Sequence, residues 1–250
     1  KSLREIVVET GRAIGYVPGN HVDAEKYVVE SSVCLLVGEP HKWTRHVNDQ
    51  SIVIGWAGYD ARTRYLPPEH FLAHVFRDAL VESCRNGALA GHGPDGKLLV
   101  RLREEADGWW VEHVLVTIQQ LESAALLDVC EAVSEALREA YEGLRERDGR
   151  WRAPWGEVEL SLNPNGPLLN GGSDGDNGQT GRKLAVDFYG PRVPIGGGAL
   201  SGKHLSHIDR IGSYAAREAA VRAVKSGAKE CLVRLCYAPN VPEPLDVAIE

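Results

Sequence analysis

Two glycine-rich stretches between residues 163 and 209 constrain this chain more than any other part of its sequence. The first ends in Gly181-Arg182-Lys183, and the second, GGGALSGK, ends at Lys203 and leads into a helix expected from about Ser206. Glycine lets backbone N–H groups approach a ligand closely, and a helix N-terminus adds partial positive charge. With three lysine and arginine cations beside them, these stretches predict a polyphosphate site, where a neighbouring carboxylate suits magnesium.

Two common phosphate-binding motifs come close to this stretch without matching it. Gly197 to Lys203 fits G-x-x-x-x-G-K, but His204 follows, whereas a P-loop has Ser or Thr there to ligate magnesium. No strand leads directly into the loop, and no G-x-G-x-x-G follows a strand, so a Rossmann site has no support. The stretch therefore predicts phosphate binding of another kind.

Composition excludes several classes of protein. The chain has 250 residues, of which 43% are hydrophobic, and a net charge of −7, so a general nucleic-acid surface is not expected. No run of about eighteen apolar residues is present, so we expect no membrane span. Five cysteines without a C-x-x-C pair indicate reduced thiols in a cytoplasmic protein.

Hydrophobic periodicity predicts an α+β protein. We expect helices at residues 1–16, 67–87, 122–144 and 206–226, a turn at 91–96, and strands at 31–37, 51–57, 97–103, 109–118, 158–162, 184–189, 231–237 and 245–250. Residues 49–162 then form a complete βαββαβ repeat with an antiparallel sheet and two covering helices. Residues 1–48 are the remainder of a first repeat and 163–250 an incomplete last one, so we expect residues to be missing at both ends.

Several motifs resemble one family, the methionine adenosyltransferases (S-adenosylmethionine synthetases). DGDNGQTGRKLAVDFYG and GGGALSGK…IDR…SYAAR are similar to the C-terminal third of its members. The segment from Asp49 to Ala57 resembles D-Q-G-x-x-x-G-Y-A, with Ser51 in place of glycine and Trp56 in place of tyrosine. Pro94 to Lys97 resembles P-D-x-K. The likeness covers nearly the whole chain and implies a pseudo-threefold arrangement of βαββαβ repeats, with the first and last incomplete here.

The resemblance implies an enzyme that makes S-adenosylmethionine by attack of the methionine sulfur on C5′ of ATP, followed by hydrolysis of the triphosphate. It implies Mg²⁺ and K⁺ as cofactors, and a homodimer or homotetramer with the site at the subunit interface. It also implies the site residues. Lys97, Arg182, Lys183 and Lys203 clamp the triphosphate; Asp95, Gly96, Leu168, Asp176 and Ala199 also contact ATP; Asp49, Asp176 and His207 lie at the methionine; Asp209 binds magnesium.

Some of these residues have simpler explanations that the sequence leaves open. Lys97 could be a solvated strand end, and Arg182-Lys183 a charged turn. Asp209 stands three residues after Ser206, so it could serve only in a capping box.

The chain also departs from the family. His204 replaces an acidic residue, His207 replaces a lysine, and Leu168 replaces a phenylalanine that stacks on adenine. The H-P-D-K motif is absent from this sequence. A second hypothesis is therefore a non-catalytic relative that binds nucleotide or regulates a partner.

Overall fold

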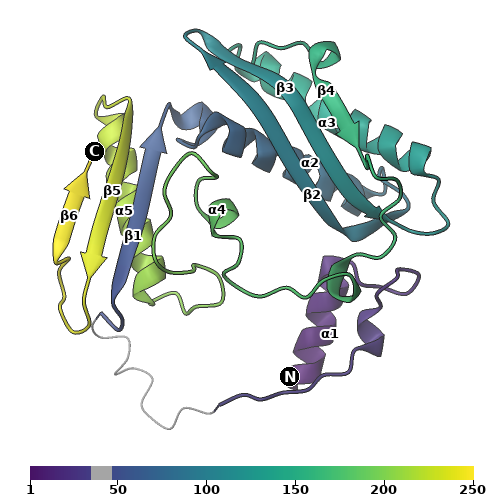
Figure 1. Ribbon diagram of the computed structural model, residues 1–250, viewed down its shortest axis with the longest axis horizontal. Coiled ribbons are helices and arrows are strands. Elements are labelled where there is room, and N and C mark those ends of the chain that lie inside the picture. Colours follow the sequence, from purple (N-terminus) through teal and green to yellow (C-terminus); the bar gives the residue numbers. More distant parts are fainter. Residues whose placement is uncertain (35–46) are drawn as a thin grey trace. The chain divides into compact units, whose positions relative to one another are not determined.

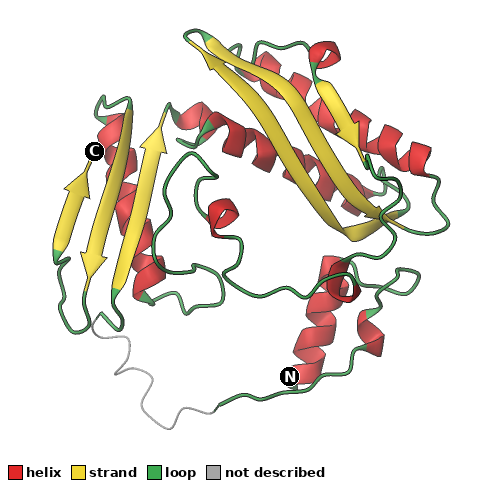
Figure 2. Cartoon of the chain, viewed as in Figure 1, coloured by secondary structure: helices red, strands yellow, loops and turns green. Residues whose placement is uncertain are grey.

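The computed structural model describes residues 1–34 and 47–250, and its internal contacts divide the chain into two compact units (Figure 1). Unit 1 consists of Lys1–Val33 and Leu72–Gly178, and unit 2 of Cys34–Phe71 and Gln179–Glu250. Each unit contains a three-stranded sheet (Figure 2). The predicted mixed α+β class is confirmed. No helix in the described part of the chain combines the length and apolarity needed to cross a membrane.

Unit 1 begins with helix α1 (Leu3–Ile14), whose two ends are set by local sequence. Ser2 and Glu5 form a capping box at its start, and Gly15 ends it with φ +116°. A single 3₁₀ turn, η1 (Ala24–Lys26), follows. The predicted N-terminal helix is therefore confirmed.

The sheet of unit 1 is built on a long hairpin of β2 (His92–Glu105) and β3 (Gly108–Gln120). Strand β4 (Glu159–Leu162) runs parallel to β3. Helix α3 (Leu126–Arg147) and most of helix α2 (Pro68–Asn86) belong to the same unit. They meet in an aromatic core in which Phe76 of α2 packs against Tyr141 of α3 and against Trp155 of the 3₁₀ turn η4 (Trp155–Glu157).

The sheet of unit 2 has the order β1-β5-β6 and is antiparallel throughout. Its strands are β1 (Ser51–Gly58), β5 (Glu230–Tyr237) and β6 (Asp246–Ile249), and helix α5 (Ile208–Lys225) packs on one face. A Cβ atom built at Gly55 would lie 2.0 Å from the backbone carbonyl carbon of Ala216. Glycine at this position therefore lets α5 lie directly on β1, which brings the start of α5 close to the start of the strand.

Strand β1 is buried on both faces, and this corrects the predicted sheet of residues 49–162. Val53 and Ala57 face the core under α5, while Ile54 and Trp56 face a second core with Phe188 and Tyr189. In the sheet, β1 pairs with β5 and not with the hairpin of unit 1. The expected antiparallel sheet is also wrong in detail, since β4 is parallel to β3.

Three further predictions of secondary structure were wrong or only partly described. The expected strand at 184–189 is one helical turn, α4 (Leu184–Asp187), because Phe188 and Tyr189 leave it to cover the face of β1. The expected turn at 91–96 lies within β2, at an irregularity of its pairing. Of the strand expected at 31–37, residues 31–34 are exposed and not in a strand, and the rest lies outside the described residues.

Candidate functional site

The second glycine-rich stretch lies against the start of β1, and two of its glycines leave no room for a side chain. The N–H of Gly197 donates to the carbonyl of Ile52 at 2.8 Å. A Cβ at Gly196 would lie 2.5 Å from that carbonyl oxygen, and one at Gly198 would lie 2.1 Å from the carboxylate of Asp209. The run of glycines therefore serves to bring backbone against both a strand and a buried carboxylate.

Asp209, in the first turn of α5, is the centre of a buried hydrogen-bond network. Asp209 is only 5% exposed. The hydroxyl of Ser51 donates to Oδ1 at 2.5 Å, and the ammonium of Lys203 donates to Oδ2. Both carboxylate oxygens thus have a donor, which a buried charge requires.

The network lowers the pKa of Asp209. Burial by itself would raise the pKa, but the hydrogen bonds from Lys203 and Ser51 and the positive charge of Lys203 outweigh it. The carboxylate is therefore held in its charged form, as a ligand for a cation or a partner for Lys203.

His207 caps the N-terminus of α5. Its Nδ1 accepts the backbone N–H of Asp209 at 3.2 Å, and its Nε2 lies 3.9 Å from the carboxylate of Asp49. The alternative that Asp209 serves only a capping box with Ser206 is therefore wrong, because His207 is the N-cap and the Asp209 side chain binds Ser51 and Lys203. A lysine here would have no acceptor for that N–H.

A cavity of about 630 Å³ opens beside this network, entirely within unit 2. One part of its lining is polar and contains Asp49, Ser51, Lys203 and Asp209. Another part is largely apolar and is formed by Ile52, Cys236, Tyr237, Ala238, Pro239 and Leu245. The cavity is therefore charged on one side and largely apolar on the other.

Within unit 2 the two glycine-rich stretches contact each other. A Cβ at Gly181 would lie 2.8 Å from the Cβ of Ala199, and one at Gly202 would lie 2.7 Å from the Cγ2 of Thr180. The predicted Ala199 contact thus lies directly beside the first stretch. Arg182 and Lys183 follow, both exposed, and Lys183 is the N-cap residue of α4.

A second group of predicted site residues lies in unit 1, around Asp95. The Oδ2 atom of Asp95 accepts the N–H of Gly172 at 2.9 Å, and its own N–H donates to Gln119 Oε1 at 3.3 Å. Gln119 in turn donates from Nε2 to the carbonyl of Leu169 at 3.0 Å. Asp95 therefore anchors the start of the first glycine-rich stretch, including the 3₁₀ turn η5 (Gly172–Asp174).

Other residues of this group surround that anchor. The carbonyl of Leu168 accepts the N–H of Gln120 at 2.9 Å, and the N–H of Asp176 donates to the carbonyl of Gly172 at 3.1 Å. Leu168 is partly buried and Asp176 is exposed. Both positions are thus fixed through their backbone, while the carboxylate of Asp176 faces solvent.

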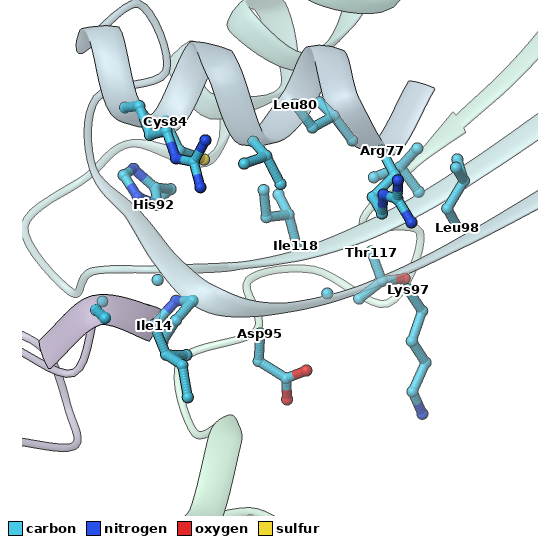
Figure 3. A pocket seen from close by; sticks show the side chains of 18 residues that line it. Ile14, Arg77, Leu80, Cys84, His92, Asp95, Lys97, Leu98, Thr117 and Ile118 are labelled. Atoms are coloured by element: carbon cyan, nitrogen blue, oxygen red, sulfur yellow. The ribbon is translucent and has the colours of Figure 1, made fainter. Parts of the chain in front are cut away.

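Lys97 and Asp95 extend from the same side of β2, away from helix α2 (Figure 3). Both residues line a cavity of about 520 Å³, whose lining also includes Leu80, Cys84 and His92. Gly96 lines the cavity between them and pairs with Ile118 of β3. Lys97 is exposed, so its ammonium can reach a ligand. The same exposure fits the alternative that Lys97 is only a solvated strand residue.

The described residues contain no group of three or more His, Cys, Asp or Glu side chains that could hold a metal by themselves. The unit 2 cavity is lined by two carboxylates, those of Asp49 and Asp209, and both oxygens of Asp209 already accept hydrogen bonds. Magnesium is commonly bound by one or two carboxylates together with waters and substrate phosphates. The site therefore fits a magnesium ion that arrives with a polyphosphate rather than one held in a cage of protein ligands.

Two contributors to the network were not assigned roles from the sequence. Ser51 was recognised only as a replacement of glycine, and its bond to Asp209 joins residues 158 apart in the chain. Arg210 supports the second stretch by donating from Nη1 to the carbonyl of Lys203 at 2.9 Å. Its place in the I-D-R motif was the signal that could have identified it.

Comparison with known proteins agrees with the motifs. The family model of the S-adenosylmethionine synthetase C-terminal domain matches residues 170–250. S-adenosylmethionine synthase of Rhodospirillum centenum is 39% identical over 205 residues, covering 81% of this chain and 50% of the relative. The synthase of Paracoccus denitrificans is 34% identical over 260 positions, covering 98% of this chain and 62% of the relative.

A solved structure is also similar, that of an unusual S-adenosylmethionine synthetase from Campylobacter jejuni. It has a TM-score of 0.80 and 28% identity and covers 99% of this chain and 64% of that one. The chain thus spans between 50% and 64% of the length of these relatives. It is a divergent member of the S-adenosylmethionine synthetase family.

Proposed function

We propose that the protein takes part in the synthesis of S-adenosylmethionine from ATP and L-methionine. The sulfur of methionine attacks C5′ of ATP, a C–S bond forms, and the C–O bond breaks with its electron pair going to the triphosphate. The triphosphate is then hydrolysed. Sulfur needs no general base for the first step, so the demand on the protein is to stabilise charge on the leaving triphosphate.

The observation that carries this proposal is the buried network of Ser51, Asp209 and Lys203 at the edge of the unit 2 cavity. The network holds an ammonium group on a glycine-rich loop beside a space large enough for a substrate. Arg182 and Lys183 of the same unit are proposed as further phosphate ligands. Lys97 is proposed as a triphosphate ligand from the resemblance alone. A non-binding protein would have little use for a lysine held in this way.

We assign Mg²⁺ to Asp209 together with the triphosphate. When bound, the ion supplies further positive charge for the leaving group. Asp209 would help to hold the ion, and Lys203, whose ammonium has three N–H donors, would bind a phosphate oxygen while it keeps its bond to Asp209. K⁺ is proposed from the resemblance alone, and no residue of this chain is assigned to it.

The remaining assignments are also proposals. Asp95, Gly96, Leu168, Asp176 and Ala199 contact ATP, and Asp49, Asp176 and His207 lie at methionine. A homodimer or homotetramer with the site at the subunit interface and a cytoplasmic location complete the proposal.

The test is an assay of the whole protein with ATP, L-methionine, MgCl₂ and KCl. Formation of S-adenosylmethionine together with phosphate and pyrophosphate is the expected result. ATP hydrolysis without S-adenosylmethionine would contradict the proposal, as would the absence of both products when ATP is shown to bind.

The second candidate is a non-catalytic relative that binds nucleotide. Three replacements favour it: His204, His207 and Leu168 stand where the family pattern has an acidic residue, a lysine and a phenylalanine. Its expected signature is ATP binding that methionine does not alter, with no product. Methionine-dependent product formation would exclude it.

A further inference from the structure

Ser51 stands where the D-Q-G pattern that this sequence resembles has glycine, and its side chain is part of the Asp209 network. It is the first residue of β1, it is 8% exposed, and it pairs with Tyr237 of β5. Its hydroxyl donates to Asp209 Oδ1 at 2.5 Å. A glycine has no side chain and could not make this bond, so the strand and the helix are tied here in a way the family pattern lacks.

The two oxygens of the Asp209 carboxylate have different partners. Oδ1 is held by Ser51, which leaves Oδ2 as the oxygen that receives the Lys203 ammonium. A hydrogen bond to one oxygen restrains rotation of the carboxylate about its Cβ–Cγ bond, and so restrains where the other oxygen lies. The position of Oδ2, and with it the resting position of the ammonium at the cavity, is therefore set from β1.

We infer that Ser51 is a positioning residue, which orients Asp209 and through it holds the Lys203 ammonium toward an anionic ligand in the unit 2 cavity. This inference rests on the proposed function, because it takes the ligand to be a polyphosphate. Ser51 itself makes no contact with the ligand. Its effect passes through two hydrogen bonds, and it should therefore depend on Lys203 being present.

The experiment is a calorimetric titration of the whole protein with inorganic tripolyphosphate and without added magnesium, so that the affinity reports the Lys203 ammonium and not a metal ion at Asp209. Ser51→Ala should weaken binding by about tenfold, the scale of one hydrogen bond to a charged group. Ser51→Thr keeps the hydroxyl on a residue that strands accommodate well, and it should restore affinity to within about threefold of the wild type. Thermal unfolding of every variant reports whether it is folded.

A double-mutant cycle separates positioning from a merely structural role. In a Lys203→Ala background, Ser51→Ala should change tripolyphosphate affinity by less than about twofold, because the group it positions is gone. An equal loss in both backgrounds would overturn the inference. So would a Ser51→Ala protein that melts at a lower temperature and binds as tightly as the wild type.

The outcomes also separate this inference from the proposed function. If the wild type binds tripolyphosphate but makes no S-adenosylmethionine, the proposed synthesis fails, and the ratios between variants still decide the role of Ser51. If the wild type does not bind tripolyphosphate, the polyphosphate assignment and the role of Ser51 both fail.

Discussion

Two aspartates of this chain do opposite things with their carboxylates. Asp209 is buried, and its oxygens are taken by the side chains of Ser51 and Lys203. Asp95 is partly exposed, and its Oδ2 accepts a backbone N–H, that of Gly172. A lysine ammonium has further N–H donors to offer a ligand, whereas a backbone donor fixes the path of the chain.

The difference shows what each region contributes. The region around Asp209 holds the Lys203 ammonium at a cavity, and the region around Asp95 keeps a loop in its conformation. The following predictions test that contrast, beginning with the change expected to have the largest effect.

Removing the Lys203 ammonium should affect turnover most. Lys203→Ala should lower the rate of S-adenosylmethionine formation by on the order of a hundredfold or more, as for loss of one transition-state donor. Steady-state rates at saturating ATP and methionine measure it. Lys229→Ala, an exposed lysine outside the network, is the matched control. Unchanged turnover in Lys203→Ala would remove the triphosphate assignment.

Filling the space beside Asp209 should affect stability. A Cβ at Gly198 would lie 2.1 Å from the carboxylate carbon of Asp209. Gly198→Ala should therefore lower the free energy of unfolding by about 1–3 kcal/mol, the usual range for overpacking. Gly143→Ala, in α3 with nothing within 4 Å, is the control and should not destabilise the protein. Urea unfolding compares the two, and equal effects would mean that Gly198 has room to spare.

Changing the cap of α5 should have a smaller effect. His207→Lys removes the acceptor for the N–H of Asp209, and loss of an N-cap acceptor costs about 1 kcal/mol. His207→Asn keeps an acceptor of a preferred capping type and should retain most of the stability. Thermal unfolding distinguishes them. The turnover of His207→Lys adds a separate result: a rise would show that histidine impairs catalysis here, and a loss would show that it is needed.

Removing the Asp95 carboxylate should have the smallest effect on the free energy of unfolding, and this effect should be confined to the loop that Asp95 anchors. Asp95→Ala removes the acceptor of the Gly172 N–H, and a hydrogen bond of this kind contributes about 0.5–1.5 kcal/mol. Hydrogen exchange should become faster at residues 172–176 while α3 keeps its protection. Glu131→Ala, an exposed carboxylate on α3, is the control. Uniform loss of protection would contradict a local role for Asp95.

Local signals in the sequence were sufficient for most helices and strands. The capping box at Ser2 and the glycine at position 15 fixed α1, and the alternating hairpin residues predicted β2 and β3. Long-range pairing was not readable. Strand β1 is joined to β5, some 170 residues later, because it needs apolar cover on both faces. For the same reason Phe188 and Tyr189 cover that strand instead of extending a strand of their own.

The charged residues of the candidate site could be predicted from the sequence, but the hydrogen bonds that join them could not. Glycine-rich stretches with neighbouring cations indicate phosphate binding wherever they occur, so Lys203 and Asp209 could be named from the sequence. That Asp209 is held by Ser51 depends on α5 lying close to β1, which Gly55 permits. The alternative of a capping box looked equally good in the sequence, because spacing says nothing of where a side chain points.

The contact between the two glycine-rich stretches has a consequence for how this protein can vary. Gly181 meets Ala199, and Gly202 meets Thr180, each without room for one more carbon atom. Both glycines also have positive φ, +83° at Gly181 and +79° at Gly202, so a side chain there would be strained as well as crowded. A library that randomises either stretch should therefore keep these two glycines, because most replacements would disrupt the contact between the stretches.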